Sequence, residues 1–279
     1  MATLKSKPKA TENESEELMI EATSQEVSFA DDIEVFEMLA GYRDADGVIH
    51  KEFTLREMTG RDEEAIHRTD VKNNSSKVVS VLLSRCVTRI GTLTMKSVGG
   101  RDKWEKIIKS LYVGDQDYML VQLRRLSIGE EIEVNHVCPN PECKTKLHTI
   151  LNLDELEVVP FHGVREIPFE LPRGYKDKKS VVHKTGTMRL ATGLDREILT
   201  PLAKTNLAKA ETVMLTRLCT FDDGAHIDED VMGNLSIRDR EYLQKLLQEH
   251  YFGVKTETEV TCDSCGETFI GSLSASNFI

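Results

Sequence analysis

Long apolar runs are missing from this chain of 279 residues, and no signal-peptide pattern is present. Without such runs, the chain has no segment that could cross a bilayer. An excess of basic residues is missing too, because 36 Lys and Arg residues stand against 47 Asp and Glu residues, which gives a net charge of −11. The sequence therefore predicts a soluble protein that is made in a cytoplasm, binds no membrane and repels a phosphate backbone.

Motifs that carry catalysis are missing as well. The sequence has no glycine-rich phosphate loop, no nucleophile elbow, no metal motif with an open coordination position and no supported pair of carboxylates. These absences predict that the protein is not an enzyme and has no small-molecule substrate.

What the sequence does contain is an internal repeat. Residues 36–44 (FEMLAGYRD) recur as residues 169–177 (FELPRGYKD), and the alignment continues without a gap to Glu64 and Glu197. Further matches follow in the same order: residues 81–85 with 213–217, residues 115–118 with 239–242, and Gly129 with Gly253. Chance similarity does not keep register through so many segments. The repeat predicts three parts, with residues 1–30 before a first repeat at 31–160 and a second repeat at 161–279.

Each repeat is predicted to be α+β, with a β-hairpin, a small helical bundle and a zinc-knuckle hairpin. In repeat 1, an Asp-Gly turn between strand-like residues 33–39 and 48–57 is typical of a hairpin. Repeat 2 has residues 178–180 (KKS) at that turn, so we expect a different or longer turn there. The predicted helices cover residues 59–70, 76–89, 115–127 and 238–251, and glycines follow the last two as helix caps.

Two segments have no full counterpart in the second repeat. The first 30 residues are acidic and have few bulky apolar side chains, which predicts a disordered acidic arm. That arm is either a solvated tail or a segment that folds onto a neighbouring subunit. Repeat 1 also has a longer central segment with the only tryptophan, Trp104, on a short amphipathic helix with Ile107, Ile108 and Leu111. Trp104 either packs in the core or anchors a partner.

Four of the six cysteines form two closely spaced pairs, Cys138 with Cys143 and Cys262 with Cys265, at matching positions of the repeats. Each pair lies between two β-prone runs, and such a short turn presents two thiolates to a metal. We predict that the two knuckles together form one zinc-ribbon-like site with a single Zn²⁺. Four thiolates saturate the ion and leave no position for water or substrate, so the zinc is expected to be structural.

Other interpretations of the cysteine pairs stay open. Cys262 and Cys265 could form a redox pair, although no thioredoxin-like pattern surrounds them. Iron–sulfur ligation is a further alternative, and each knuckle could instead close with a knuckle of another subunit. His136 and His148 flank the first knuckle and could act as ligands, but four cysteines already fill the coordination sphere.

The remaining cysteines and a matched pair of histidines are expected to be structural. Cys86 and Cys219 lie on apolar helical segments, which predicts buried hydrophobic residues. His50 and His183 align with each other on predicted strands, and each is followed by lysine.

Three segments resemble a known family when they are taken in order with the first knuckle. Residues 53–64 are FTLREMTGRDEE, residues 114–134 are GDQDYMLVQLRRLSIGEEIEV, and residues 151–158 are LNLDELEV, after a knuckle that begins Cys-Pro. Together they resemble the T4-type bacteriophage baseplate (hub and tail-assembly) protein family of contractile-tailed phages. The resemblance covers most of residues 50–160 and is fainter in repeat 2.

The resemblance implies a structural or assembly role in the hub region of a baseplate, with other baseplate and tail proteins as partners and no catalysis. It further implies a place in the host cytoplasm during assembly and then in the baseplate of the virion tail. One alternative is a tail-assembly chaperone that is absent from the mature particle. Another is a zinc-ribbon module for nucleic acid, which the acidic residues around both knuckles oppose.

Overall fold

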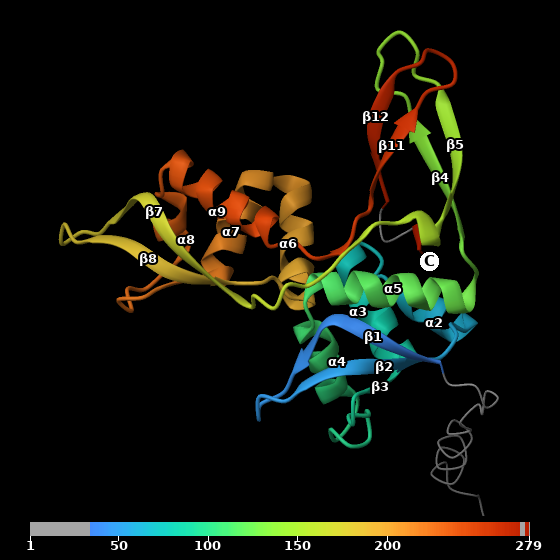
Figure 1. Cartoon of the computed structure of the whole chain (residues 1–279), viewed down its shortest axis with the longest axis horizontal. Coiled ribbons are helices and arrows are strands. Elements are labelled where there is room, and N and C mark those ends of the chain that lie inside the picture. The colour runs from blue at the N-terminus through green and yellow to red at the C-terminus, as the bar shows by residue number, and fades with distance from the viewer. Residues whose placement is uncertain (1–33, 274–276, 279) are drawn as a thin grey trace, which may run out of the picture. The chain divides into compact units, whose positions relative to one another are not determined.

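The computed structural model describes residues 34–273, 277 and 278, which belong to one compact unit that spans residues 33–279. The predicted acidic arm, residues 1–30, lies outside the described residues. Within the described part of the chain, no helix is both long and apolar enough to cross a membrane. Helices and strands are both abundant, which confirms the predicted α+β class (Figure 1).

The first half of the described chain, residues 34–160, begins with a β-hairpin and continues into a group of helices (Figure 1). Strands β1, β2 and β3 form an antiparallel sheet in that order, and helix α5 packs against β1. The elements are β1 (Val35–Arg43), β2 (Ile49–Leu55), α2 (Gly60–Ile66), α3 (Ser75–Cys86), β3 (Val87–Ile90), α4 (Arg101–Ser110), α5 (Val113–Ser127), β4 (Glu131–Val137), β5 (Lys146–Asn152), the 3₁₀ helix η1 (Leu153–Glu155) and β6 (Val158–Val159).

The second half, residues 161–278, has a similar order of elements. Strands β7, β8 and β9 form an antiparallel sheet in that order, and α9 packs against β7. The elements are β7 (Glu166–Lys176), β8 (Val182–Arg189), α6 (Gly193–Thr205), α7 (Leu207–Leu218), β9 (Cys219–Phe221), α8 (Glu229–Gly233), α9 (Ile237–Glu249), β10 (Gly253–Val254), β11 (Glu257–Thr261) and β12 (Thr268–Ser272).

The first hairpin of each half has the same irregularity at a matching position. The strand register shifts within residues 37–42 of β1 and within residues 170–175 of β7. Gly41 and Gly174 lie in these bulges with φ angles of 79° and 82°. A Cβ atom at either glycine would come within 2.8 Å of a backbone carbonyl oxygen of the paired strand. The repeated glycine is therefore required by the backbone geometry of the bulge.

The expected difference between the two hairpin turns is wrong. Asp177 Oδ1 accepts hydrogen bonds from the amides two and four residues later, and Asp44 Oδ1 does the same in the first half. Ser180 takes a φ of 65° where the first half has Gly47 at 84°. Because the Asp side chain holds the turn in each case, the turn keeps its length and shape although its sequence changes.

The prediction of a helix over residues 76–89 is wrong at its C-terminal end. Helix α3 stops at Cys86, and the next residues form β3, the third strand of the sheet. The second half makes the same change where α7 ends at Leu218 and β9 begins. Val87, Thr88 and Ile90 favour extended backbone, and β2 offers them an open edge for hydrogen bonds. The predicted helix over residues 59–70 is also shorter, because α2 ends at Ile66.

The predicted glycine cap is confirmed for α5 but is wrong for α9. Gly129 comes directly after Ile128, the C-cap residue of α5, and has a φ of 120°. Helix α5 begins two residues earlier than predicted, and α9 ends two residues earlier, at Glu249, with His250 as its C-cap residue. Gly253 lies in β10 with a φ of 127°, and a Cβ atom there would lie 2.8 Å from Gly114 Cα in the first turn of α5. Only a residue without a side chain allows this close approach between the two halves.

The core consists of two main hydrophobic clusters, and each of them contains residues from both halves. The first contains Phe53 and the fully buried Trp104, so Trp104 packs in the core and not against a partner. The second contains Phe169 and Met188. Residues cross over in both directions: Ala40 of the first half belongs to the second cluster, whereas Val254, Leu273 and Phe278 of the second half belong to the first. The two halves are therefore packed as one body.

Candidate metal centre

Two hairpins, one from each half, bring the four predicted cysteines together. Strands β4 and β5 form the first hairpin, and strands β11 and β12 form the second. They lie beside each other, and their turns meet at the same end (Figure 1). Because each turn contains one cysteine pair, residues far apart in the sequence share one small volume.

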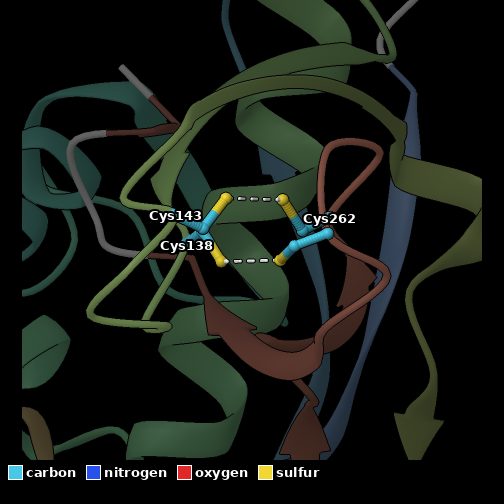
Figure 2. A group of neighbouring side chains, drawn as sticks. Cys138, Cys143 and Cys262 are labelled. Carbon is cyan, nitrogen blue, oxygen red and sulfur yellow. Dashed lines mark hydrogen bonds between the residues drawn. The ribbon is translucent and has the colours of Figure 1, made fainter.

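The distances between the sulfur atoms match a tetrahedral metal site. The Sγ atoms of Cys138, Cys143, Cys262 and Cys265 all lie within 4.8 Å of one another. The Cys138–Cys265 and Cys143–Cys262 Sγ atoms are 3.7 Å and 3.8 Å apart, and dashed lines in Figure 2 mark these two contacts. A Zn²⁺ ion with bonds of about 2.3 Å to four sulfurs requires edges of about 3.8 Å. The donor set and its size therefore fit Zn²⁺.

The backbone of each knuckle turns in the same way. The residue after the second cysteine has a positive φ in both cases, 49° at Lys144 and 75° at Gly266. The amide of the first cysteine donates across the turn, from Cys138 N to Thr145 O at 2.9 Å and from Cys262 N to Glu267 O at 2.8 Å. The two knuckles therefore present their sulfurs alike although the first turn is longer.

Neither nearby histidine belongs to the sulfur cluster. The His136 ring packs edge-on against Phe269, and its Cε1 atom would lie 2.5 Å from a Cβ atom at Gly271. His136 therefore fills space between the hairpins. His148 is exposed and contacts Asn135 Oδ1 at 3.2 Å. Four cysteine sulfurs remain as the donor set.

The protonation of the thiols shows why a cation suits this cluster. A hydrogen bond with the Thr145 hydroxyl, helped by the Thr145 amide, lowers the pKa of Cys143 to about 6. The Glu267 amide alone would lower the pKa of Cys265, but burial and the neighbouring thiols outweigh it and raise that pKa to about 12. Neighbouring sulfurs cannot all carry negative charge without a counterion. A divalent cation between them favours the ionised form of all four.

The other two cysteines are buried, as predicted. Both thiols are free, and burial raises the pKa of each, Cys86 and Cys219, to about 12. Their thiolate forms are therefore scarce at neutral pH, which makes them poor metal ligands and poor nucleophiles.

A short ladder joins the bases of the two cysteine hairpins. Strand β6 follows the first hairpin, strand β10 precedes the second, and the two pair antiparallel through Val158–Val254 and Val159–Gly253. Next to them, Lys255 Nζ contacts Glu157 Oε1 at 2.8 Å. This ladder was not expected from the sequence. It fixes the starting points from which both hairpins reach the cluster.

Each half also contains a buried charge network that the sequence analysis did not predict. In the first half, Asp62 accepts hydrogen bonds from Arg56 and Arg85 at 2.6 to 3.0 Å. In the second half, Asp195 accepts hydrogen bonds from Arg189 and Arg217 at 2.6 to 2.9 Å. The signal was present in the sequence, since all these charged residues recur at matching positions of the repeat.

The same aspartates cap the helices α2 and α6. Asp62 Oδ2 accepts from Thr59 N, and Asp195 Oδ2 accepts from Thr192 N, in capping boxes of the same form. Burial alone would raise the pKa of each aspartate, but the hydrogen bonds from Arg and Thr outweigh it. They lower the pKa of Asp62 far below its ordinary value and that of Asp195 to about 2. Both carboxylates are therefore ionised and serve the fold.

The fold and the cysteine cluster define an α+β protein in which four cysteine sulfurs from two similar halves lie together. The chain belongs to the T4 bacteriophage base plate protein family, whose model matches residues 48–274, and this confirms the resemblance seen in the sequence. Membership makes it a structural component of a phage baseplate, which is part of the virion tail and is built from contacts with other baseplate and tail proteins. No curated protein and no solved structure shows significant similarity to the chain.

Proposed function

We propose that this chain is a zinc-stabilised scaffold in the hub region of a contractile-tail baseplate, where it holds neighbouring proteins in a fixed geometry. The observation that carries the proposal is the approach of four cysteine sulfurs to within 4.8 Å of one another. Zn²⁺ held there joins a hairpin of the first half to a hairpin of the second. Because four thiolates leave no open coordination position, the ion clamps the fold and takes no part in chemistry.

The chain is further proposed to be an internal duplication, with repeats at residues 31–160 and 161–279. The matched bulges at Gly41 and Gly174, the matched turns and the matched networks around Asp62 and Asp195 support this proposal. A single metal then closes two copies of one unit. In a baseplate, which must withstand force when the tail contracts, such a clamp opposes separation of the two copies.

The metal content of the purified full-length protein tests the scaffold proposal. We expect one zinc per chain by elemental analysis, with a native mass that gives the number of chains. Cys138→Ser and Cys262→Ser should each lose the zinc. Cys219→Ala is the matched control, since it removes a buried thiol outside the cluster and should keep the zinc.

Other stoichiometries would count against the intrachain clamp. Two metals per chain, or zinc retained only in dimers, would mean that each knuckle closes with another subunit. Protein without metal would leave the cysteine pairs as redox groups, and a visible absorption spectrum would indicate an iron–sulfur cluster.

Purified particles separate the scaffold from an assembly chaperone. A scaffold component remains in the mature tail and should be found there at a fixed copy number by quantitative mass spectrometry, whereas a chaperone should be absent. Nucleic-acid binding is tested by titration with DNA and RNA at low and high salt, and we expect no salt-dependent binding.

The N-terminal arm is proposed to contact a neighbouring subunit. Deletion of residues 1–30 should then leave the metal content and the circular dichroism spectrum unchanged but impair baseplate assembly. Normal particles from the deletion variant would show that the arm is only a solvated tail.

A further inference from the structure

A basic cleft lies where the two halves meet. Its cavity of about 620 Å³ is lined by the end of β1, the end of α4, the start of α6 and parts of β8 and α7. Its lining includes six basic residues but only one acidic residue, Asp195. The basic residues are Arg43, Lys106, Lys109, Arg165, Arg189 and Arg217. Such a concentration of positive charge is notable in a chain with a net charge of −11.

Part of this positive charge is not neutralised within the described residues. Lys109 contacts Glu105 and Glu197, and Asp195 is shared by two arginines. In contrast, Arg43 and Lys106 are exposed and make no ion pair in the described part of the chain. The cleft therefore carries charge that the protein itself leaves available to an anionic ligand.

Arg165 adds a further positive charge to the wall of the cleft. Its Nη2 atom donates to Ala40 O at 2.6 Å, and its guanidinium stacks over the Tyr112 and Phe161 rings at 5.4 and 5.3 Å. Its Nη1 atom is buried and has no hydrogen-bond partner among the described residues. Packing and one carbonyl thus hold this guanidinium in place without a direct ion pair among the described residues, and the nearby buried Asp115 offsets part of its charge.

The cleft also has an apolar part, which decides between kinds of anion. Leu111, Tyr112, Leu190 and Leu194 line it beside the basic side chains, and Leu194 is exposed. A nucleic-acid backbone needs a long basic surface, and the acidic remainder of this chain would repel it. A short peptide with carboxylates around apolar side chains matches both parts of the cleft.

The chain itself contains such a peptide. Residues 12–21 (ENESEELMIE) have five glutamates, no basic residue, and the apolar run Leu-Met-Ile. We infer that residues 12–21 of a neighbouring copy of this chain bind in the basic cleft, with glutamates at Arg43 and Lys106 and the apolar run against the leucines. The inference rests on the proposed arm contact between subunits and identifies where the arm binds.

Zero-length cross-linking of the full-length protein tests the inference. A carbodiimide joins an amine to a carboxylate only where the two are in contact. A mixture of chains of natural isotope content and chains labelled with ¹⁵N tells links between copies from links within one copy. We expect Lys106 to be linked to a glutamate of residues 12–21, with light chains joined to heavy chains, and the link to disappear in 1 M salt.

Two charge-reversal variants sharpen the test. Arg43→Glu reverses an exposed charge in the cleft and should lower the yield of the mixed-isotope link about fivefold or more. Lys103→Glu makes the same charge reversal on α4 outside the cleft, so it should leave the yield unchanged. Circular dichroism and zinc content verify that both variants are folded.

The remaining outcomes each overturn part of the inference. Links found only between chains of the same isotope content would mean that the arm of the same chain occupies the cleft. Absence of the link, or an equal loss with Lys103→Glu, would exclude the arm as the occupant. Either result could occur in a protein that holds one zinc per chain and is present in particles, so the scaffold proposal would stand independently.

Discussion

The charge networks of the two halves are built alike but lie at different depths. Asp62 and Asp195 are both fully buried, and each accepts hydrogen bonds from two arginines. The arginines of the first half are 28% and 20% exposed, whereas those of the second half are 40% and 31% exposed. The same charges are therefore screened more weakly by water in the first half.

The last long helix of each half is also covered differently. Helix α5 is packed by Val254, Leu273 and Phe278, all contributed by the second half. Helix α9 instead borders an open groove of about 710 Å³ that is lined by Met214, Leu247 and other residues of its own half. Residues contributed by the other half thus cover the last long helix of the first half but leave a groove open beside that of the second half. We therefore expect the first half to be the more stable of the two, because it receives the segments that both halves share.

Metal removal should have the largest effect. It should destabilise the ribbon formed by the two cysteine hairpins and leave both helical bundles stable. The ribbon has only a small hydrophobic cluster of its own, with Leu147, Val260 and Phe269 around the cysteines. Structural zinc contributes about 10–16 kcal/mol of apparent binding energy in small zinc domains. After chelation, amide exchange should become at least about 100-fold faster in β4, β5, β11 and β12 and remain slow in β1, β2, β7 and β8. Equal acceleration everywhere would mean that the metal supports the whole fold.

Truncation of a large buried side chain should weaken the first half more than the second. Trp104 is fully buried in the first cluster, and Met232 is fully buried in the second. We expect Trp104→Ala to cost about 3–5 kcal/mol and Met232→Ala roughly 2–3 kcal/mol, because the larger side chain leaves the larger cavity. Urea unfolding followed by circular dichroism measures both. A larger loss for Met232→Ala would show that cavity size does not decide the cost at these two sites.

Features with a local cause could be predicted from the sequence. The hairpins and the glycine cap of α5 follow from turn residues and from apolar periodicity, whereas the sequence left Trp104 open between the core and a partner contact. The cysteine set was predictable for another reason, since the sequence similarity between the halves aligns Cys138 with Cys262. The structure then brings all four sulfurs together within one chain.

Features that depend on contacts between distant segments could not be predicted. Residues 87–90 continue an apolar helical pattern in the sequence, and only the open edge of β2 makes them a strand. The β6–β10 ladder joins residues about one hundred positions apart, each strand being only two residues long. The basic cleft likewise collects residues from five elements, so its charges lie apart in the sequence and form no run there.

Removal of the buried carboxylate should be more costly in the first half. Asp62→Asn leaves two arginines without a counterion and weakens a helix cap, which we expect to cost about 3 kcal/mol, against about 2 kcal/mol for Asp195→Asn with its more exposed arginines. Trp104 fluorescence reports unfolding of the first half, and circular dichroism reports both. Asp154→Asn is the control, since its pair with Arg125 is exposed and should contribute less than about 1 kcal/mol. Equal costs would show that burial of the arginines does not matter.

The smallest expected difference concerns the matched histidines. His50 Nε2 contacts one carboxylate, Asp44, at 2.9 Å, whereas His183 contacts Asp177 at 3.6 Å and Asp223 at 2.6 Å. At the position of Asp223 the first half has Gly91, where a Cβ atom would lie only 2.3 Å from His50 Nδ1. The first half therefore has no room for a second carboxylate, and only His183 gains one.

That second carboxylate should make the stability of the second half depend on pH. The hydrogen bond to Asp223, reinforced by the charges of Asp223 and Asp177, raises the pKa of His183 above its ordinary value of 6.5. Stabilisation by the protonated imidazole is then complete below about pH 6.5 and is lost as the pH rises through the folded-state pKa. Asp223→Asn should lower that pKa and flatten the dependence, which an NMR titration of the His183 ring and urea unfolding between pH 6 and 8.5 would measure. A pKa of His183 that stays the same in Asp223→Asn would show that the pair does not hold the proton.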